Sequence, residues 1–254
     1  MLLNSYDVIA KQRSKYYQYY IFKEKSKYYF AKQQINMDRV HAEMLENEIE
    51  KYNKLKNDCI LPNIYYYDLK RSKIIIYEYL KKQAKSDLLN LDFNEKIKIL
   101  IKICEKIEIM HSKNIVHCDL KPDNIIILKN KVRIIDMGNS RYIGETTDYG
   151  NLKYSSYLQL KREKVSTFFD IYPMGIIIYE VISNEKAFEN KKTEEIITLK
   201  KNNYIHKIDV KNNDMFNKKI NKILCRCCVN TPEIRYQNIK ELINDLVALL
   251  LIIS

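Results

Sequence analysis

The first 80 residues alternate short apolar runs, rich in tyrosine and isoleucine, with charged turns. Runs of aromatic and β-branched residues bounded by polar residues are typical of β-strands. The pattern predicts strands at residues 15–22, 27–32, 64–68 and 74–79. Between the second and third strands, apolar residues recur at helical spacing and predict a helix over about 38–56. We therefore expect a small antiparallel sheet with one helix in this part of the chain.

Beyond residue 80 the apolar positions follow a mainly helical spacing. Asp92 is followed three residues later by Glu95, which resembles a capping box and predicts the start of a helix. The other elements predicted are strands at 124–128 and 131–135, and helices around 170–182 and from 238 onward. A sheet-rich small lobe thus precedes a helix-rich large lobe, which predicts an α+β fold.

Composition supports a folded chain and narrows its partners. Of 254 residues 46% are hydrophobic, which excludes global disorder and suits one large domain or two closely packed small ones. The net charge of +12 is compatible with nucleic acid, with an anionic membrane, or with acidic or phosphorylated partners. The basic residues are scattered in short pairs among Asn, Ile and Tyr, which favours a compositional bias over a dedicated nucleic-acid surface.

The lack of a recognisable signal peptide and the spacing of the cysteines lead us to expect an intracellular chain. The N-terminus lacks the charged stretch followed by an apolar run that is typical of a signal peptide. The longest apolar run, 246–253, is far short of the ~20 residues that span a bilayer, and we expect it to be the buried end of the last helix. The six cysteines have no framework spacing and no second pair of zinc ligands. We expect free thiols and a cytoplasmic location, with the nucleus as an open alternative.

The strongest chemical signal is the segment 117–124, His-Cys-Asp-Leu-Lys-Pro-Asp-Asn, which Asp136-Met137-Gly138 follows downstream. Phosphoryl transfer requires a carboxylate near the accepting hydroxyl, a cation near the phosphate and oxygen ligands for Mg²⁺. Asp119 is the candidate base, and Lys121 is the candidate cation. Asn124 and Asp136 are the candidate metal ligands.

These residues resemble the motifs of the eukaryotic-type protein kinases, and the resemblance covers nearly the whole chain. Segment 117–124 looks like the catalytic loop, and residues 136–138 look like the metal-binding Asp-Phe-Gly turn. Lys121, two residues after the candidate base, is typical of the serine/threonine type. The segment 150–154 looks like the loop that receives the substrate residue. The resemblance implies that Asp170 braces the backbone of the catalytic loop.

The resemblance extends to the small lobe. Lys32 falls where the family has its strand-three lysine, and Glu48 falls where it has the helix-C glutamate, with the register supported by Leu55 and by 62–64. The pair they form in the family positions the α- and β-phosphates of ATP. Taken alone, either residue would be one solvated charge among many.

The remaining nucleotide-site residues follow from the same resemblance. Glu78 and Leu80 lie in the segment that looks like the hinge, whose backbone would pair with adenine. Tyr77 would be a bulky gatekeeper, and Ile126 would line the nucleotide.

Four departures from the family pattern stand beside the matches. The glycine-rich phosphate loop should lie at 10–17, yet that segment contains no glycine. Glycine there lets backbone N–H groups approach phosphate without a Cβ in the way. Phe30 stands where the family has a small alanine against adenine, and Ala31 would replace it only if the strand register shifts.

The other two departures concern the large lobe. Cys118 replaces an arginine that pairs with an activation-loop phosphate in many members. Ser-Tyr-Leu at 156–158 replaces Ala-Pro-Glu, so Arg235 loses its expected partner, and Glu163 is the candidate substitute.

The resemblance implies an α+β, two-lobed protein-kinase-like fold, with one kinase domain over 1–254 that divides into lobes 1–80 and 81–254. It implies an ATP- and Mg²⁺-dependent serine/threonine protein kinase that acts on a protein substrate and is open to an activating or regulatory protein. We expect no membrane and no nucleic-acid partner. One alternative is a pseudokinase that serves as a scaffold or decoy, because of the missing glycines, Phe30 and the altered Ala-Pro-Glu triplet. A second is a small-molecule phosphotransferase of the same fold, whose relatives typically lack a lysine at the position of Lys121.

Overall fold

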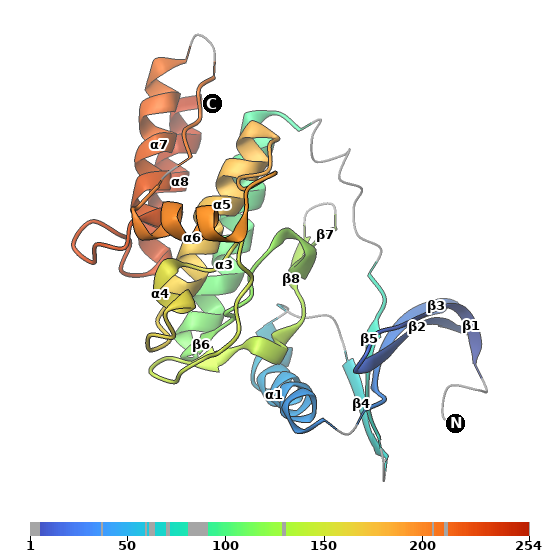
Figure 1. The fold of residues 1–254 in the computed structure, drawn as a ribbon. Coiled ribbons are helices and arrows are strands. Elements are labelled where there is room, and N and C mark those ends of the chain that lie inside the picture. The colour runs from blue at the N-terminus through green and yellow to red at the C-terminus, as the bar shows by residue number, and fades with distance from the viewer. Residues whose placement is uncertain are drawn as a thin grey trace. The chain divides into compact units, whose positions relative to one another are not determined.

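The computed structural model describes residues 6–36, 38–58, 60, 64–69, 72–80, 91–128, 131–204, 206–210 and 213–253. The chain divides into two compact units, each shown in Figure 1. Unit 1 comprises Met1–Lys82 and Arg133–Asn139, and unit 2 comprises Gln83–Val132 and Ser140–Ser254. Unit 1 therefore contains a short segment that returns from the second half of the chain.

Unit 1 is built on a five-stranded antiparallel sheet with the strand order β1-β2-β3-β5-β4 (Figure 1). The strands are β1 (Asp7–Arg13), β2 (Tyr17–Glu24), β3 (Lys27–Gln34), β4 (Ile64–Leu69) and β5 (Ser72–Glu78). The four predicted strands are confirmed, with shifted ends. The sequence pattern missed β1, because every residue of this edge strand is exposed and no apolar face alternates along it.

The register of the central strands decides which side chains share a face. Phe30 lies opposite Tyr77 and Lys32 lies opposite Ile75, with no bulge in β3. Directly opposed residues of an antiparallel pair project from the same face, and so do residues two apart in one strand. Phe30 and Lys32 therefore share a face. Ala31 is fully buried on the other one in a cluster with Phe22, Ile74 and Ile76, so the alternative of a register shift that exchanges Ala31 for Phe30 is wrong.

One helix, α1 (Arg39–Leu55), covers the Lys32 face of the sheet and confirms the predicted helix. The Asp38 side chain caps it by accepting a hydrogen bond from the backbone N–H of His41 at 3.1 Å. Leu45 of the helix packs with Tyr17 and Ile75 of the sheet. A single 3₁₀ turn, η2 (Lys56–Asp58), follows the helix.

Unit 2 is mainly helical. It begins with α3 (Phe93–Ser112), whose capping box between Asp92 and Glu95 confirms the predicted helix start. Its short elements are β6 (Ile115–Val116), η3 (Pro122–Asn124), β7 (Ile125–Leu128) and β9 (Arg141–Tyr142). The strand β8 (Lys131–Ile134) runs from unit 2 into the segment that returns to unit 1, and η4 (Met137–Asn139) lies in that segment. The later helices are α4 (Tyr157–Leu160), α5 (Phe168–Ser183), α6 (Thr193–Lys201), α7 (Asp214–Cys228) and α8 (Ile239–Ile253). Together the two units confirm the expected α+β architecture.

The apolar run at 246–253 forms the end of α8, as predicted, but only one side of it is buried. Leu246 and Leu249 are buried, whereas Leu251 is 77% exposed. Helical periodicity separates these residues, so a continuous apolar run did not imply burial of every member. In the described part of the chain, no helix combines the length and the apolar character needed to cross a membrane.

The interior of unit 2 is close-packed around α5. Gly175 lies where an added Cβ would stand 2.5 Å from Cβ of Cys227 and 2.8 Å from Sγ of Cys228, both on α7. These two cysteines are buried free thiols, which agrees with the expected absence of disulfides among the described cysteines. Cys59 lies outside the described residues.

We expect Gly175→Ala to lower the free energy of unfolding by about 1–3 kcal/mol, because the methyl group overpacks the contact between α5 and α7. Urea unfolding measures the change. At an uncrowded helix position the same substitution would stabilise the protein by about 1 kcal/mol. The sign of the effect is therefore diagnostic, and a gain in stability would contradict the packing described here.

Candidate active site

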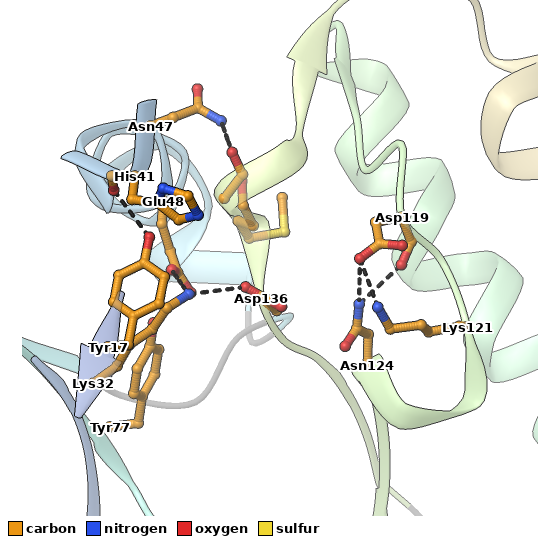
Figure 2. Close-up of polar contacts among 12 residues, drawn as sticks. Tyr17, Lys32, His41, Asn47, Glu48, Tyr77, Asp119, Lys121, Asn124 and Asp136 are labelled. Carbon is orange, nitrogen blue, oxygen red and sulfur yellow. Dashed lines mark hydrogen bonds and ion pairs between the residues drawn. The ribbon is translucent and has the colours of Figure 1, made fainter. Parts of the chain in front are cut away.

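In unit 1 the structure brings together three predicted site residues that are far apart in sequence. Nζ of Lys32, on β3, lies 3.1 Å from Oε2 of Glu48 on α1. The same Nζ lies 3.2 Å from Oδ1 of Asp136, in the segment that returns to this unit (Figure 2). Lys32 and Glu48 are buried, whereas the Asp136 side chain is 42% exposed. One ammonium group thus joins the sheet, the helix and the returning segment.

Burial and neighbouring charges shift the pKa values of Lys32 and Glu48 in opposite directions. Burial lowers the pKa of Lys32, but the Glu48 and Asp136 carboxylates outweigh burial and raise it above its usual value. Burial raises the pKa of Glu48, and the Lys32 charge acts against that rise. Lys32 is therefore an ammonium ion at neutral pH, suited to contact an anionic group.

Two tyrosines complete the surroundings of the cluster (Figure 2). The Tyr77 hydroxyl donates a hydrogen bond to Oε1 of Glu48, so both carboxylate oxygens of Glu48 have a donor. The Tyr17 hydroxyl donates to the backbone oxygen of His41 on α1 at 2.9 Å. Nζ of Lys32 lies 4.9 Å from the centre of the Tyr17 ring, within the range of a cation–π contact. Sequence reasoning identified Tyr77 but missed Tyr17, whose only signal was an aromatic residue at the end of the glycine-free loop.

The glycine-free segment 10–17 forms the end of β1, a tight turn and the start of β2. The backbone N–H of Ser14 donates to the carbonyl of Tyr17 at 2.8 Å, and the Ser14 hydroxyl oxygen accepts from the N–H of Tyr17 at 3.0 Å. The segment is described in full, and none of its residues has a positive φ. This hairpin therefore closes without the backbone conformations for which glycine is needed. The Tyr16 ring stacks on His41 of α1 with 3.6 Å between ring centroids.

In unit 2 the predicted catalytic loop forms a compact polar arrangement. Nζ of Lys121 lies 2.7 Å from Oδ2 of Asp119. The carboxamide nitrogen of Asn124 donates to the backbone oxygen of Asp119 at 2.9 Å. As Figure 2 shows, the carboxamide oxygen of Asn124 points away from Asp119. The three candidate residues of this loop therefore contact one another within η3 and the turn before it.

Asp170, at the start of α5, holds this loop in place, which confirms the bracing expected from the sequence. Its buried carboxylate accepts hydrogen bonds from the backbone N–H of His117 at 2.8 Å and of Cys118 at 3.1 Å. A third contact, at 3.0 Å, comes from Nε2 of His111 on α3. Cys118 has φ 63, a left-handed conformation that is unfavourable for a residue with a side chain. The two backbone hydrogen bonds to Asp170 compensate for that strain.

The Cys118 side chain is buried among apolar residues rather than directed at a phosphate. It packs with Val116, Val165 and Phe169. Burial raises the pKa of its thiol well above the usual range, so the thiol is neutral at physiological pH. The catalytic loop therefore supplies no cation at this position.

The other predicted residues lie at the following places. Glu78 ends β5, and Leu80 follows it; both are half-buried. Ile126 is buried in β7 of unit 2. The guanidinium group of Arg235 lies 4.3 Å from the centre of the Phe168 ring. None of the ion pairs among the described residues joins Arg235 to Glu163. Burial lowers the pKa of Arg235, and the Glu163 charge acts against that decrease. Residues 62–63, which supported the register of Glu48, lie outside the described residues.

The donor chemistry suits Mg²⁺, which binds through carboxylate or carboxamide oxygens, typically one or two from protein together with substrate phosphates. Asp136 offers a partly exposed carboxylate in unit 1, and Asn124 offers a carboxamide oxygen in unit 2. Among the described residues, no group of three or more His, Cys, Asp or Glu side chains is arranged to hold a metal by itself.

A lysine–glutamate pair between a strand and a helix, an Asp-x-Gly turn and a braced His-x-Asp loop are the parts of a protein kinase. A family model described as protein kinase domain matches residues 16–247, and the chain belongs to this family. It is 29% identical over 187 residues to a probable serine/threonine-protein kinase of Clostridium acetobutylicum, covering 68% of this chain and 28% of the relative.

Two further relatives are similarly distant. The serine/threonine-protein kinase PknB of Mycobacterium leprae is 24% identical over 190 residues, which cover 68% of this chain and 30% of the relative. A probable serine/threonine-protein kinase of Clostridium perfringens is 27% identical over 184 residues, with coverages of 68% and 27%. The matches thus span less than a third of the length of these curated relatives.

The buried cluster can be tested with a double-mutant cycle of Lys32→Met and Glu48→Gln. Because both partners are buried, we expect a coupling free energy above about 1 kcal/mol in urea unfolding. The control is the pair Arg39–Glu43 on the same helix, at 2.9 Å but exposed, for which we expect a coupling close to zero. Equal coupling for the two pairs would contradict the role of burial.

Proposed function

We propose that this chain is a kinase domain that transfers the γ-phosphate of ATP, with Mg²⁺, to a serine or threonine hydroxyl of a protein substrate. The observation that carries the proposal is Lys32, held as an ammonium ion between Glu48 and Asp136. Protein kinases need this lysine–glutamate pair and the metal-binding aspartate in place at the same time. A chain that had lost catalysis would have no need to keep all three.

In this proposal each residue has a separate task. Lys32, kept in place by Glu48, contacts the α- and β-phosphates, the backbone at Glu78 and Leu80 pairs with adenine, and Ile126 lines the nucleotide. Asp136 and Asn124 supply oxygen ligands to Mg²⁺, which neutralises the phosphate charge when it is bound.

The proton is handled by the catalytic loop. Asp119 accepts the proton of the attacking hydroxyl, and Lys121 stands 2.7 Å from that carboxylate, ready to neutralise the transferred phosphate. Cys118 supplies no cation, so we propose that order in the following segment depends on an activating or regulatory protein rather than on a phosphate.

A second candidate, a pseudokinase scaffold with weak or no catalysis, is favoured by one specific observation. Phe30 shares the Lys32 face of the sheet, and its ring lies 5.8 Å from that of Tyr19 and 6.0 Å from that of Tyr77. With the Tyr17 ring beside Nζ of Lys32, aromatic side chains occupy much of the face that adenine and phosphate would need. The two candidates differ in whether Mg-ATP binds and reacts.

The proposal predicts that Asp119→Asn lowers the rate of Mg-ATP-dependent phosphorylation of a protein substrate by about 10²–10⁴-fold, since general-base catalysis contributes that much. The substitution keeps the shape of the side chain, so the melting temperature should stay close to that of the wild type. A radiolabel-transfer assay measures the rate. The control is Asp214→Asn, an exposed aspartate of the same unit that has no proposed role. Equal activity in the wild type and in Asp119→Asn would end the kinase proposal.

The aromatic face predicts weak ATP binding that Phe30→Ala improves, because removal of the ring opens space for adenine. In place of glycine the loop offers Lys11, Arg13 and Lys15, whose point charges are screened by salt, so affinity should also fall as ionic strength rises. Thermal-shift titration with Mg-ATP reports affinity, because stabilisation grows as RT ln(1 + [L]/Kd).

The control for this titration is Tyr28→Ala, an exposed aromatic residue on the same strand. Tight, salt-insensitive binding by the wild type that is unchanged or weakened in Phe30→Ala would contradict the prediction. Absence of a shift for every variant at millimolar Mg-ATP would favour the scaffold.

A further inference from the structure

Lys200, near the end of α6, is a lysine that none of the roles above uses, and it is 1% exposed. Its Nζ donates hydrogen bonds to two backbone carbonyls, that of Ser155 at 2.5 Å and that of Lys153 at 3.2 Å. Lys153 and Ser155 flank Tyr154, at the end of the segment that resembles the substrate-receiving loop. The buried amine of Lys200 thus attaches to the backbone of this loop.

Two aromatic rings also lie close to Nζ of Lys200. The centre of the Tyr172 ring on α5 lies 4.6 Å away, and that of Phe188 lies 5.0 Å away. None of the ion pairs among the described residues includes Lys200. Carbonyl oxygens and π-faces are the groups that solvate a cation without a counter-charge. Burial of an amine without a counter-charge costs free energy of folding, so the two hydrogen bonds from Lys200 to the loop need an explanation.

The loop needs such a contact because its family anchor is missing. Leu158 stands where the family has a glutamate, and Arg235 lies over Phe168 instead of pairing with a carboxylate. An ion pair that would attach the loop to the helical core is therefore absent at these positions. Lys200 attaches the same loop to α6 by a different type of contact.

A chain of contacts links Ser155 to the catalytic segment. Gly150 is packed so closely that an added Cβ would lie 2.6 Å from Oγ of Ser155. Beside Gly150, the backbone oxygen of Tyr149 accepts a hydrogen bond from Nε2 of Gln159 at 3.0 Å, and the same nitrogen donates to the backbone oxygen of Cys118 at 2.7 Å. Cys118 directly precedes Asp119. A displacement of Ser155 would therefore disturb both the loop and its connection to the catalytic segment.

We propose that Lys200 is a positioning residue for the protein substrate, and that its side-chain amine ties the loop 150–156 to α6 in place of the family's carboxylate–arginine pair. The proposal rests on the proposed function in so far as this loop receives substrate. The tie itself does not depend on catalysis and can be measured without it.

The test compares Lys200→Met, which keeps the length and apolar stem but removes the donors, with Lys201→Met, its exposed neighbour on the same helix. Hydrogen exchange of amides 149–156, followed by mass spectrometry, measures opening of the loop. Loss of two hydrogen bonds from an amine should speed this exchange about tenfold or more in Lys200→Met, with exchange in Lys201→Met like that of the wild type. Unchanged exchange in Lys200→Met would overturn the tie.

Steady-state kinetics separate positioning from general structural damage. We expect the KM for a protein substrate to rise about tenfold in Lys200→Met, while the KM for ATP stays within about twofold of the wild type. Equal loss for both substrates would overturn the positioning role. If the wild type itself transfers no phosphate, the proposed function fails, whereas the exchange result still decides the tie.

A wild-type experiment covers the case in which Lys200→Met does not fold. Burial lowers the pKa of Lys200 to about 7, against about 10.5 when solvated, so an opening that exposes Lys200 takes up a proton above pH 7. Opening should become rarer from pH 7 to 9, after correction for the intrinsic exchange rate. The groups that face Lys200 do not titrate in that window: the pKa of Tyr172 is raised well above 10, that of Cys228 is raised to about 12, and that of His206 is lowered to about 4, each by burial. Protection that is independent of pH would overturn the inference.

Discussion

The ammonium group of Lys32 is the point on which the structure of unit 1 depends. It is buried, so its charge must be balanced locally, and the two carboxylates that balance it come from different parts of the chain. Glu48 draws α1 onto the sheet, and Asp136 draws in the segment 133–139. The amide of Asn47 reinforces this attachment, donating to the backbone oxygens of Met137 at 3.2 Å and Gly138 at 3.0 Å. The contacts that balance the buried charge of Lys32 are therefore also the contacts that attach α1 and the segment 133–139 to the sheet.

The glycine-free hairpin at residues 10–17 lies beside the Lys32 cluster and contacts the same helix. In this chain the turn is closed by Ser14 and attached to α1 through Tyr16 and Tyr17, which contact His41. The helix that carries Glu48 is therefore held from two sides, by the Lys32 pair and by the hairpin. The segment keeps its backbone N–H groups, but each of its residues carries a Cβ that hinders the close approach of a phosphate. The Lys32–Glu48 pair is thus formed on the same face of the sheet that carries Phe30.

Much of the fold could be predicted because its strands and helices have one buried face. Where an element has no buried face, the sequence pattern does not predict it: β1 is exposed along its whole length. In the same way, the apolar run that ends α8 did not predict that Leu251 is exposed. The pair Lys32–Glu48 was expected only through resemblance, and the contact between Lys32 and Asp136 was not expected, since local pattern carries no information about pairs 16 and 104 residues apart. Lys200 could not be found at all. It stands beside Lys201 in a chain with 44 basic residues, and only tertiary packing distinguishes the two.

The central proposal is that Asp136 and Asn124 supply oxygen ligands to Mg²⁺ and that the phosphates of a nucleotide contact Lys32. Calorimetric titration of ADP with and without Mg²⁺ tests it most directly, in the wild type and in the variants Asp136→Asn and Asn124→Ala. The account predicts that Mg²⁺ tightens ADP binding in the wild type and that either substitution abolishes this increase while metal-free ADP binds as before. ADP affinity that is the same with and without Mg²⁺ in the wild type, or an increase that survives both substitutions, would contradict it.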